Sequence, residues 1–228
     1  MRKKLLPPAK QRPTLDHEGV LFSKGVQLIA GVDEAGRGPL AGPVIAAAVI
    51  LPRKISSILL RQLERLNDSK KLSLTAREEL FEVITREHEI LWAVGEGNVQ
   101  EIGDLNILRA THLAMRRALL ALKPFPEHAL IDGLPVRDFP VPQTALVGGD
   151  GLSMSIAAAS VVAKVTRDRI MEELHREFPQ YGFLQHKGYA TAAHLATLRQ
   201  YGPCKHHRRG FSPVDQIIFS FQKKVQSH

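Results

Sequence analysis

The fold class is decided by residues 26–51, VQLIAGVDEAGRGPLAGPVIAAAVIL. Residues 26–32 are apolar and rich in β-branched side chains, and residues 42–51 have a similar character, so each predicts a strand. The segment between them, GRGPLAG (36–42), contains three glycines and a proline. This composition is typical of a turn, and the sequence therefore opens with a predicted strand, turn and strand.

The rest of the chain alternates helix-like and strand-like segments. Apolar spacing and capping residues predict helices at 75–88, 107–122, 153–177 and 191–200, and strands at 89–95, 129–131 and 144–147. The helix at 107–122 has the clearest pattern, with apolar positions at Ile107, Leu108, Leu113, Leu119 and Leu120 and a stop at Pro124. A hairpin-like opening followed by alternating helices and strands predicts one α/β domain with a mixed sheet.

The excess of basic charge lies at the two ends of the chain. The formal net charge is +8, and residues 1–26 hold six basic and two acidic side chains, while residues 203–228 hold five and one. The middle of the chain is therefore balanced. The basic ends either supplement binding to a phosphate backbone or only keep the chain soluble, and both interpretations stay open.

The same division suggests where the folded domain lies. We expect residues 1–25 to form a flexible basic arm, residues 26–214 to form the folded domain, and residues 215–228 to form a tail. The tail carries apolar side chains at Ile217, Ile218, Phe219 and Phe221. These side chains either bind a protein partner or pack on the core.

Cysteine content and the N-terminal residues indicate a reducing compartment. Cys204 is the single cysteine, so no intramolecular disulfide forms, and no Cys/His spacing typical of a zinc site occurs. The two leucines at 5 and 6 are followed by two prolines, which is far short of a signal peptide, and no segment approaches the roughly 20 apolar residues of a membrane span. We therefore expect a cytoplasmic protein, with organelle targeting as the weaker alternative.

Four acidic side chains lie at the ends of predicted strands: Asp33, Glu34, Asp132 and Asp150. Strand ends are where α/β sheets gather site residues, so the four would share one pocket if these ends converge. Crowded carboxylates need a raised pKa or a bound cation, and oxygen ligands without Cys or His suit Mg²⁺ or Mn²⁺. Two such ions about 4 Å apart are typical of metal-dependent nucleases. From the residues alone, this hypothesis and that of ordinary solvated loop acids are about equal.

The metal-site hypothesis sets two geometric conditions. Asp33 and Glu34 point to opposite faces of one strand, so both reach one cluster only if the strand ends or bulges there. Asp168 follows Asp150 by 18 residues, which is about 27 Å along a helix, so the two cannot bind the same ions. We expect Asp168 to be a structural partner of neighbouring basic side chains.

Three short polar segments are candidates for contact with a phosphate or a sugar. They are Gly36, Arg37 and Gly38; Ser69, Lys70 and Lys71; and the loop of His186, Lys187, Gly188 and Tyr189, whose aromatic ring can stack on a sugar or base. A tight turn and a solvated loop are the commoner outcomes for the first two segments. We interpret His206, His207, Arg208 and Arg209 as a basic surface strip.

Seven segments together resemble the bacterial ribonuclease HII family. They are GVDEAGRGPLAGPV (31–44), DSKKLS (68–73), NILRATHLAMRRAL (106–119), IDG (131–133), GGDGLSMSIAAASVVAKVTRDR (148–169), YGFLQHKGYAT (181–191) and HHRRGFSPV (206–214). They occur in the order and at the spacing of the family, and the first and fifth are highly specific. Gly149 departs from the pattern, because a lysine often precedes the fourth acid in this family.

The resemblance implies an RNase H-like α/β fold, with a five-stranded mixed sheet whose first three strands are antiparallel and with a helical C-terminal segment. It implies an endoribonuclease that hydrolyses RNA in RNA–DNA hybrids and cuts 5′ of ribonucleotides embedded in duplex DNA, leaving 3′-hydroxyl and 5′-phosphate ends. It places catalysis and the ligation of two Mg²⁺ or Mn²⁺ ions on Asp33, Glu34, Asp132 and Asp150. Recognition of the ribose 2′-hydroxyl falls on Gly36, Arg37, Gly38 and Tyr189.

Two other functions fit the residues less well. A nucleic-acid-binding module without catalysis would bind duplexes but show no metal-dependent cleavage. A metal nuclease for DNA junctions would cut a substrate that contains no ribonucleotide. We expect the partner to be an RNA–DNA hybrid or ribonucleotide-containing DNA, the protein to be a monomer, and no membrane to be involved.

Overall fold

The computed structural model describes residues 12–66 and 72–226, and the strands in this part form one five-stranded sheet in the order β3-β2-β1-β4-β5. They are β1 (Ile29–Ala35), β2 (Val44–Ile50), β3 (Leu91–Gly97), β4 (His128–Asp132) and β5 (Gln143–Leu146). β2 pairs antiparallel with β1 and β3, whereas β4 pairs parallel with β1 and β5. The prediction of a mixed α/β sheet with three antiparallel strands at its start is confirmed.

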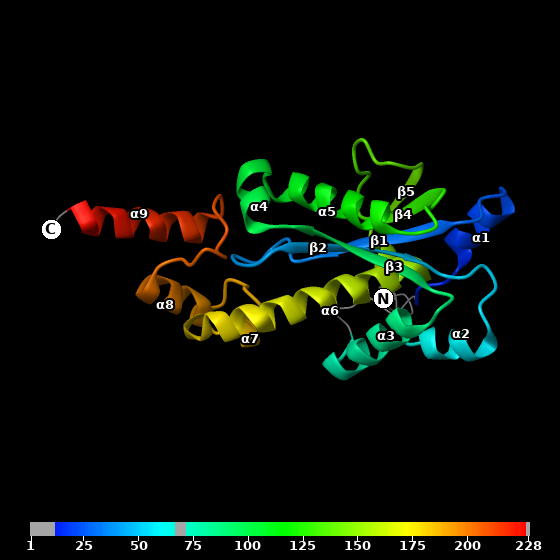
Figure 1. Cartoon of the computed structure of the whole chain (residues 1–228), viewed down its shortest axis with the longest axis horizontal. Coiled ribbons are helices and arrows are strands. Elements are labelled where there is room, and N and C mark those ends of the chain that lie inside the picture. The colour runs from blue at the N-terminus through cyan, green and yellow to red at the C-terminus, as the bar shows by residue number, and fades with distance from the viewer. Residues whose placement is uncertain (1–11, 67–71, 227–228) are drawn as a thin grey trace, which may run out of the picture.

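Helices cover both faces of the sheet (Figure 1). α4 (Val99–Leu105) and α5 (Ile107–Ala121) lie on one face, and α2 (Ser57–Leu63), α3 (Leu74–Arg86) and α6 (Met154–Glu177) lie on the other. α6 approaches β1 so closely that a Cβ on Gly31 would lie 2.1 Å from the carbonyl carbon of Ser155. On the opposite face, a Cβ on Gly95 would lie 2.2 Å from the carbonyl oxygen of Ala114. Glycine is therefore required where each helix backbone packs directly on a strand.

The close approach of α5 to the sheet also decides which of its side chains face inward. The inward positions are Ala110, Thr111, Ala114, Met115, Ala118 and Leu119. Of the apolar positions in the sequence pattern, Leu119 is buried, whereas Leu108 and Leu120 are 48% and 59% exposed. Alanines at 110, 114 and 118 occupy the closest approach to Gly95 and Gly97, where the helix backbone lies too near the strand for larger side chains.

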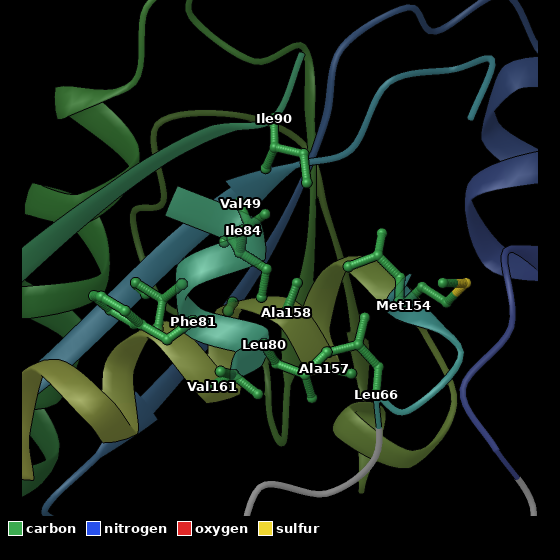
Figure 2. Close-up of a cluster of buried hydrophobic side chains, with 14 of the residues drawn as sticks. Val49, Leu66, Leu80, Phe81, Ile84, Ile90, Met154, Ala157, Ala158 and Val161 are labelled. Carbon is green, nitrogen blue, oxygen red and sulfur yellow. The ribbon is translucent and has the colours of Figure 1, made fainter. Parts of the chain in front are cut away.

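Figure 2 shows the hydrophobic core between α3, α6 and the sheet. Leu80, Phe81 and Ile84 of α3 pack with Ala157 and Val161 of α6 in this core. Removing a large apolar side chain from water contributes about 1.5–3 kcal/mol, so this cluster fixes α3 and α6 on the sheet. No helix in the described ranges has both the length and the apolar character that a membrane span needs.

A helical C-terminal segment follows α6 (Figure 1). It consists of η2 (Pro179–Tyr181), α7 (Phe183–His186), α8 (Ala192–Tyr201) and α9 (Ser212–Gln226). Its core includes Phe183, Leu198 and Val214, and Ile217 of α9 is buried with them. The expected start of a tail at 215 therefore falls inside a helix, and Ile217 packs on the core, whereas Phe219 is 59% exposed.

The expectation of a flexible arm over residues 1–25 is corrected for residues 12–25, the part that the structure describes, because these residues include a helix that packs on the domain. α1 (Asp16–Ser23) packs against the start of α6. Glu18 is 2% exposed, and its Oε1 accepts hydrogen bonds from the Ser153 hydroxyl (2.6 Å), the Ser155 hydroxyl (2.5 Å) and the Ser155 amide (3.0 Å). Glu18, which the sequence placed in a flexible arm, instead accepts hydrogen bonds from donors at the first turn of α6.

We expect Glu18→Ala to lower the free energy of unfolding by about 2–3 kcal/mol, because it leaves buried hydroxyl and amide donors without their acceptor. Urea unfolding monitored by circular dichroism measures this change. Asp16→Ala is the control, since Asp16 is an exposed acid on the same helix and should cost less than about 1 kcal/mol. Equal losses for the two variants would contradict the assignment.

Candidate active site

The four predicted acids line one cavity at the end of β1 and β4. The cavity has a volume of about 670 Å³ and is lined by Asp33, Glu34, Ala35, Gly36, Arg37, Gly38, Ile107, Asp132, Asp150, Ser160, Lys164 and Tyr189. Asp33 and Glu34 come from β1, Asp132 ends β4, and Asp150 lies in η1 (Gly149–Gly151) just before α6. The structure therefore gathers three separate chain segments, as the sequence predicts.

Asp33 and Glu34 share the cavity at the end of β1. β1 stays paired with β2 through Ala35 and ends there, one residue after Glu34. The pairing of β1 with β4 stops at Val32. Beyond this point β1 has an open edge, and side chains from its two faces can meet around that edge.

Asp33 is a strongly perturbed acid of the cavity. It is 5% exposed, and this burial raises the pKa of Asp33 well above its ordinary value. The charges of Glu34 and Asp132 raise the pKa further, whereas hydrogen bonds from the Ser160 side chain and the Glu34 backbone oppose the shift. A site that disfavours an ionised carboxyl in this way is one that a bound cation would stabilise.

Asp132 and Glu34 are held by short-range contacts within the cavity. Oδ1 of Asp132 accepts a hydrogen bond from the amide of Gly149 at 2.6 Å, which joins the end of β4 to the turn that carries Asp150. Oε1 of Glu34 lies 3.3 Å from Nη1 of Arg37. A Cβ at Gly149 would lie 2.7 Å from Cδ1 of Ile156, so the glycine that departs from the family pattern fits closely in this turn.

The donor set fits hard divalent cations, because it offers carboxylate oxygens and no thiolate or imidazole. Within the described residues, however, no three Asp, Glu, His or Cys side chains are grouped closely enough to hold an ion as they stand. The carboxyl groups surround the cavity as separate groups, which is the arrangement that mutual repulsion favours without a cation. Shared coordination of ions by these four residues stays a prediction.

The loop between β1 and β2 is held by two buried arginines that the sequence did not single out for this role. Arg208 is fully buried and donates to the carbonyl oxygens of Gly36 (2.7 Å), Arg37 (3.1 Å), Pro39 (2.9 Å), Gly42 (2.7 Å) and Pro43 (2.9 Å). Arg167 donates to the carbonyl oxygens of Ala41, Pro43 and Lys187. A guanidinium has five donors and can therefore satisfy a loop that has no strand partner for its carbonyls.

The buried arginine corrects the prediction of a basic surface strip at residues 206–209. His207 is 4% exposed and Arg208 is fully buried, and Arg209 is exposed. Sequence position did not reveal this difference, because four consecutive polar residues in a loop are usually solvated. Ser160 and Lys164 were also missed, although their spacing of one helical turn in the apolar stretch SIAAASVVAKV (155–165) was a usable signal.

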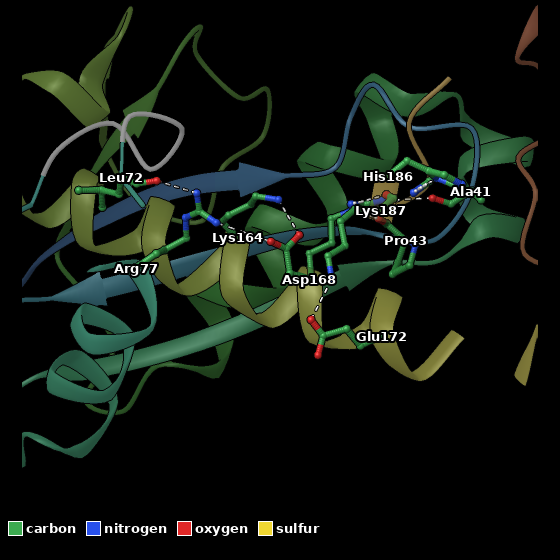
Figure 3. Close-up of polar contacts among 11 residues, drawn as sticks. Ala41, Pro43, Leu72, Arg77, Lys164, Asp168, Glu172, His186 and Lys187 are labelled. Atoms are coloured by element: carbon green, nitrogen blue, oxygen red, sulfur yellow. Dashed lines mark hydrogen bonds and ion pairs between the residues drawn. The ribbon is translucent and has the colours of Figure 1, made fainter. Parts of the chain in front are cut away.

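Asp168 is a structural residue, as predicted (Figure 3). Its Oδ1 accepts from Nζ of Lys164 at 2.5 Å, and its Oδ2 lies 3.7 Å from Nη1 of Arg77. Its sequence neighbour Arg167 instead binds backbone carbonyls, and Arg169 pairs with Glu78. Asp168 thus holds Lys164, which lines the cavity, without being part of the cavity lining itself.

Tyr189 is the residue that the structure brings to the cavity from furthest along the chain. It is 44% exposed, and a Cβ on Gly38 would lie 3.7 Å from its Cε1. The ring and the Gly36–Gly38 turn therefore form adjacent walls. Ser69, Lys70 and Lys71 lie outside the described residues.

Known proteins match the chain over most of its length. The Ribonuclease HII family profile matches residues 30–214. Ribonuclease HII of Delftia acidovorans is 55% identical over 193 residues, which cover 84% of this chain and 78% of the relative. Ribonuclease HII of Pelotomaculum thermopropionicum is 52% identical over 198 residues, which cover 87% and 73%. The crystal structure of the ribonuclease H2 from Pyrococcus horikoshii OT3 has a TM-score of 0.70 at 27% identity and covers 86% of this chain and 99% of that one.

The raised pKa of Asp33 predicts a pH-dependent stability of the metal-free protein. The protonated carboxyl favours the folded state at acid pH, and this contribution is lost as the pH rises from the ordinary value of 3.8 through the folded-state pKa. We expect Asp33→Asn to raise the melting temperature of the EDTA-treated protein at neutral pH and to flatten its dependence on pH. Scanning calorimetry at several pH values measures both effects.

The matched control is Asp138→Asn, which changes a carboxyl that is 81% exposed on the loop after β4. It should leave the melting curves at all pH values close to those of the parent protein. The electrostatic assignment is refuted if, as the pH rises, the melting temperature of the parent protein does not fall relative to that of the Asp33→Asn variant.

Proposed function

The chain belongs to the ribonuclease HII family and is therefore a hydrolase that cuts RNA in duplexes with DNA, and we propose that Asp33, Glu34, Asp132 and Asp150 are its catalytic metal ligands. The observation that supports this proposal is the convergence of the four acids on one cavity at the open edge of β1. Metal dependence is general for the family. The identity of the ions, Mg²⁺ or Mn²⁺, and their number, two, are part of the proposal.

The four carboxyl groups have unequal tasks in this proposal. Asp33 is buried beside Glu34 and Asp132 and would hold the ions together with them, while Asp150 would join from the turn that Asp132 holds through Gly149. When bound, the ions supply the positive charge that activates water and stabilises the leaving oxygen of the phosphodiester. The protein residues set where that charge lies relative to the scissile phosphate.

Recognition of the ribonucleotide is proposed to come from the Gly36–Gly38 turn and Tyr189. The carbonyl oxygens of Gly36 and Arg37 accept from Arg208. In a planar trans peptide the N–H points opposite to the C=O, so the amides of Arg37 and Gly38 point away from the buried guanidinium. Amide donors beside the ring of Tyr189 can bind a ribose 2′-hydroxyl, the group that distinguishes RNA from DNA. Cleavage on the 5′ side of that ribonucleotide, leaving 3′-hydroxyl and 5′-phosphate ends, is part of the proposal and comes from the family resemblance.

Further proposed contacts involve the phosphates of the duplex and a protein partner. Ser69, Lys70 and Lys71, together with the basic ends of the chain, would contact phosphates of the duplex. Phe219 on α9 is exposed and would be available to a protein partner. We propose that the protein acts as a monomer in the cytoplasm during removal of ribonucleotides in DNA replication and repair.

Substitution of a metal ligand tests the catalytic assignment. We expect Asp33→Asn and Asp132→Asn each to reduce cleavage of a duplex with one embedded ribonucleotide by at least about 1,000-fold, which corresponds to about 4 kcal/mol of transition-state stabilisation. Single-turnover cleavage in a titration of Mg²⁺ and of Mn²⁺ measures the loss. Asp138→Asn is the control and should keep the parent rate.

The same assay, run with a hybrid and an all-DNA duplex, separates the two other functions. Binding without metal-dependent cleavage would indicate a non-catalytic module, and cleavage of the all-DNA duplex would indicate a junction nuclease. Near-parent rates for either Asn variant would refute the ligand assignment.

Substitution of Tyr189 tests the recognition proposal. We expect Tyr189→Ala to lower cleavage at an embedded ribonucleotide by about 10- to 100-fold, since the ring no longer positions the sugar. Binding to a plain DNA duplex should change by less than about 3-fold, because phosphate contacts dominate that affinity. Fluorescence anisotropy measures binding, and equal losses in cleavage and plain-duplex binding would contradict a role at the ribonucleotide.

A further inference from the structure

Three imidazole rings gather behind Tyr189, outside the carboxylate cavity. His194 is fully buried and His207 is 4% exposed. The rings of His186 and His194 stack with centroids 4.3 Å apart and an interplanar angle of 14°. Buried histidines that only pack as core residues are common, so the significance of this cluster depends on what its ring nitrogens bind.

The hydrogen bonds of the His194–His207 pair run in one direction. The amide of Cys204 donates to Nδ1 of His207 at 3.0 Å, so this nitrogen carries no proton. Nε2 of His207 therefore bears the proton and donates to Nε2 of His194 at 3.0 Å. The proton of His194 is then on Nδ1, which donates to the carbonyl oxygen of Tyr189 at 2.9 Å. One backbone amide thus fixes the tautomers of two rings, and this series of hydrogen bonds ends at the carbonyl oxygen of Tyr189.

His186 supports the same segment with its own fixed tautomer. The amide of Gly188 donates to Nδ1 of His186 at 3.2 Å. Nε2 of His186 therefore donates to the carbonyl oxygen of Tyr181 at 2.7 Å. The ring of His186 stacks on the ring of His194. The turn that leads into Tyr189 is therefore supported by both residues.

The surroundings keep the pair uncharged, as the hydrogen-bond chain requires. Burial lowers the pKa of His194 to about 4 and that of His207 to about 3, and each ring also disfavours charge on its imidazole neighbours. A proton on Nδ1 of His207 would face the amide proton of Cys204. The neutral, single-tautomer form is therefore the one that fits the site.

We propose that His194 and His207 are positioning residues that set the backbone of Tyr189 and thereby hold its ring beside the Gly36–Gly38 turn. His194 holds the Tyr189 carbonyl directly, and His207 orients His194. Through this contact the pair controls how well the cavity distinguishes a ribonucleotide from a deoxyribonucleotide. The inference rests on the proposed function of Tyr189 in ribose recognition.

A double-mutant cycle tests whether His194 acts through Tyr189. We expect His194→Leu to lower kcat/KM for a duplex with one embedded ribonucleotide by about 10-fold, with plain-duplex binding unchanged. In a Tyr189→Ala background the same substitution should change kcat/KM by less than about 2-fold, because the ring that it positions is gone. His194→Asn should restore most of the loss, since the Asn amide can donate from near the position of Nδ1. His128→Leu is the control, because His128 lies at the end of β4 away from Asp132 and bonds Thr144.

Nitrogen-15 NMR of the parent protein supplies a readout that does not depend on activity or on the folding of a variant. We expect His207 as the Nε2–H tautomer and His194 as the Nδ1–H tautomer, coupled across one Nε2–H···Nε2 bond. The opposite tautomers, or a loss on His194→Leu that persists in the Tyr189→Ala background, would overturn the inference. If Tyr189→Ala alone leaves cleavage unchanged, the proposed role of Tyr189 fails, and the positioning role of His194 fails with it.

Discussion

Four carboxyl groups repel one another, and much of the structure serves to hold their backbones together against that repulsion. β1 and β4 run parallel, so Asp33 and Asp132 leave the sheet at the same end. The close packing of α6 on Gly31 brings the turn with Asp150 to this end, and the amide of Gly149 joins it to Asp132. Because these links are made by backbone geometry, the protein's own contacts bring the four acids to one cavity.

The sheet and the long helices could be predicted because their signals are local. The strands that open the domain and the helix now seen as α6 (Met154–Glu177) follow from runs of β-branched and small apolar residues bounded by glycines. α1, α2, α4, α7 and α9 were not predicted as individual helices. Four of them have eight residues or fewer, which is too short for a clear periodic pattern, and α1 is stabilised by distant partners, since Ser153 and Ser155 bind its Glu18. Contacts of that range leave no periodic signal in the sequence.

The acids of the candidate site could be predicted from the sequence, but the residues that hold the surrounding loops in place could be predicted much less well. Acids at three strand ends point to a shared cavity because sheet topology places those ends together. Burial of Arg208 and His207 could not be inferred from HHRR (206–209), because only the folded loop shows that five carbonyl groups need a donor. The strand ends at Ala35, close to where the sequence required it, but nothing in the sequence showed that pairing with β4 stops already at Val32.

The family match begins at residue 30, whereas the packed structure begins earlier. The backbone of Thr14 exchanges hydrogen bonds with Leu152 and Met154, and Leu21 is buried against Ile29 and Ile156. A domain boundary drawn at residue 30 would therefore cut through the hydrophobic interior and uncover the start of the helix that follows Asp150. The leading segment is part of that interior, so the helix that it covers restricts which substitutions the segment can tolerate.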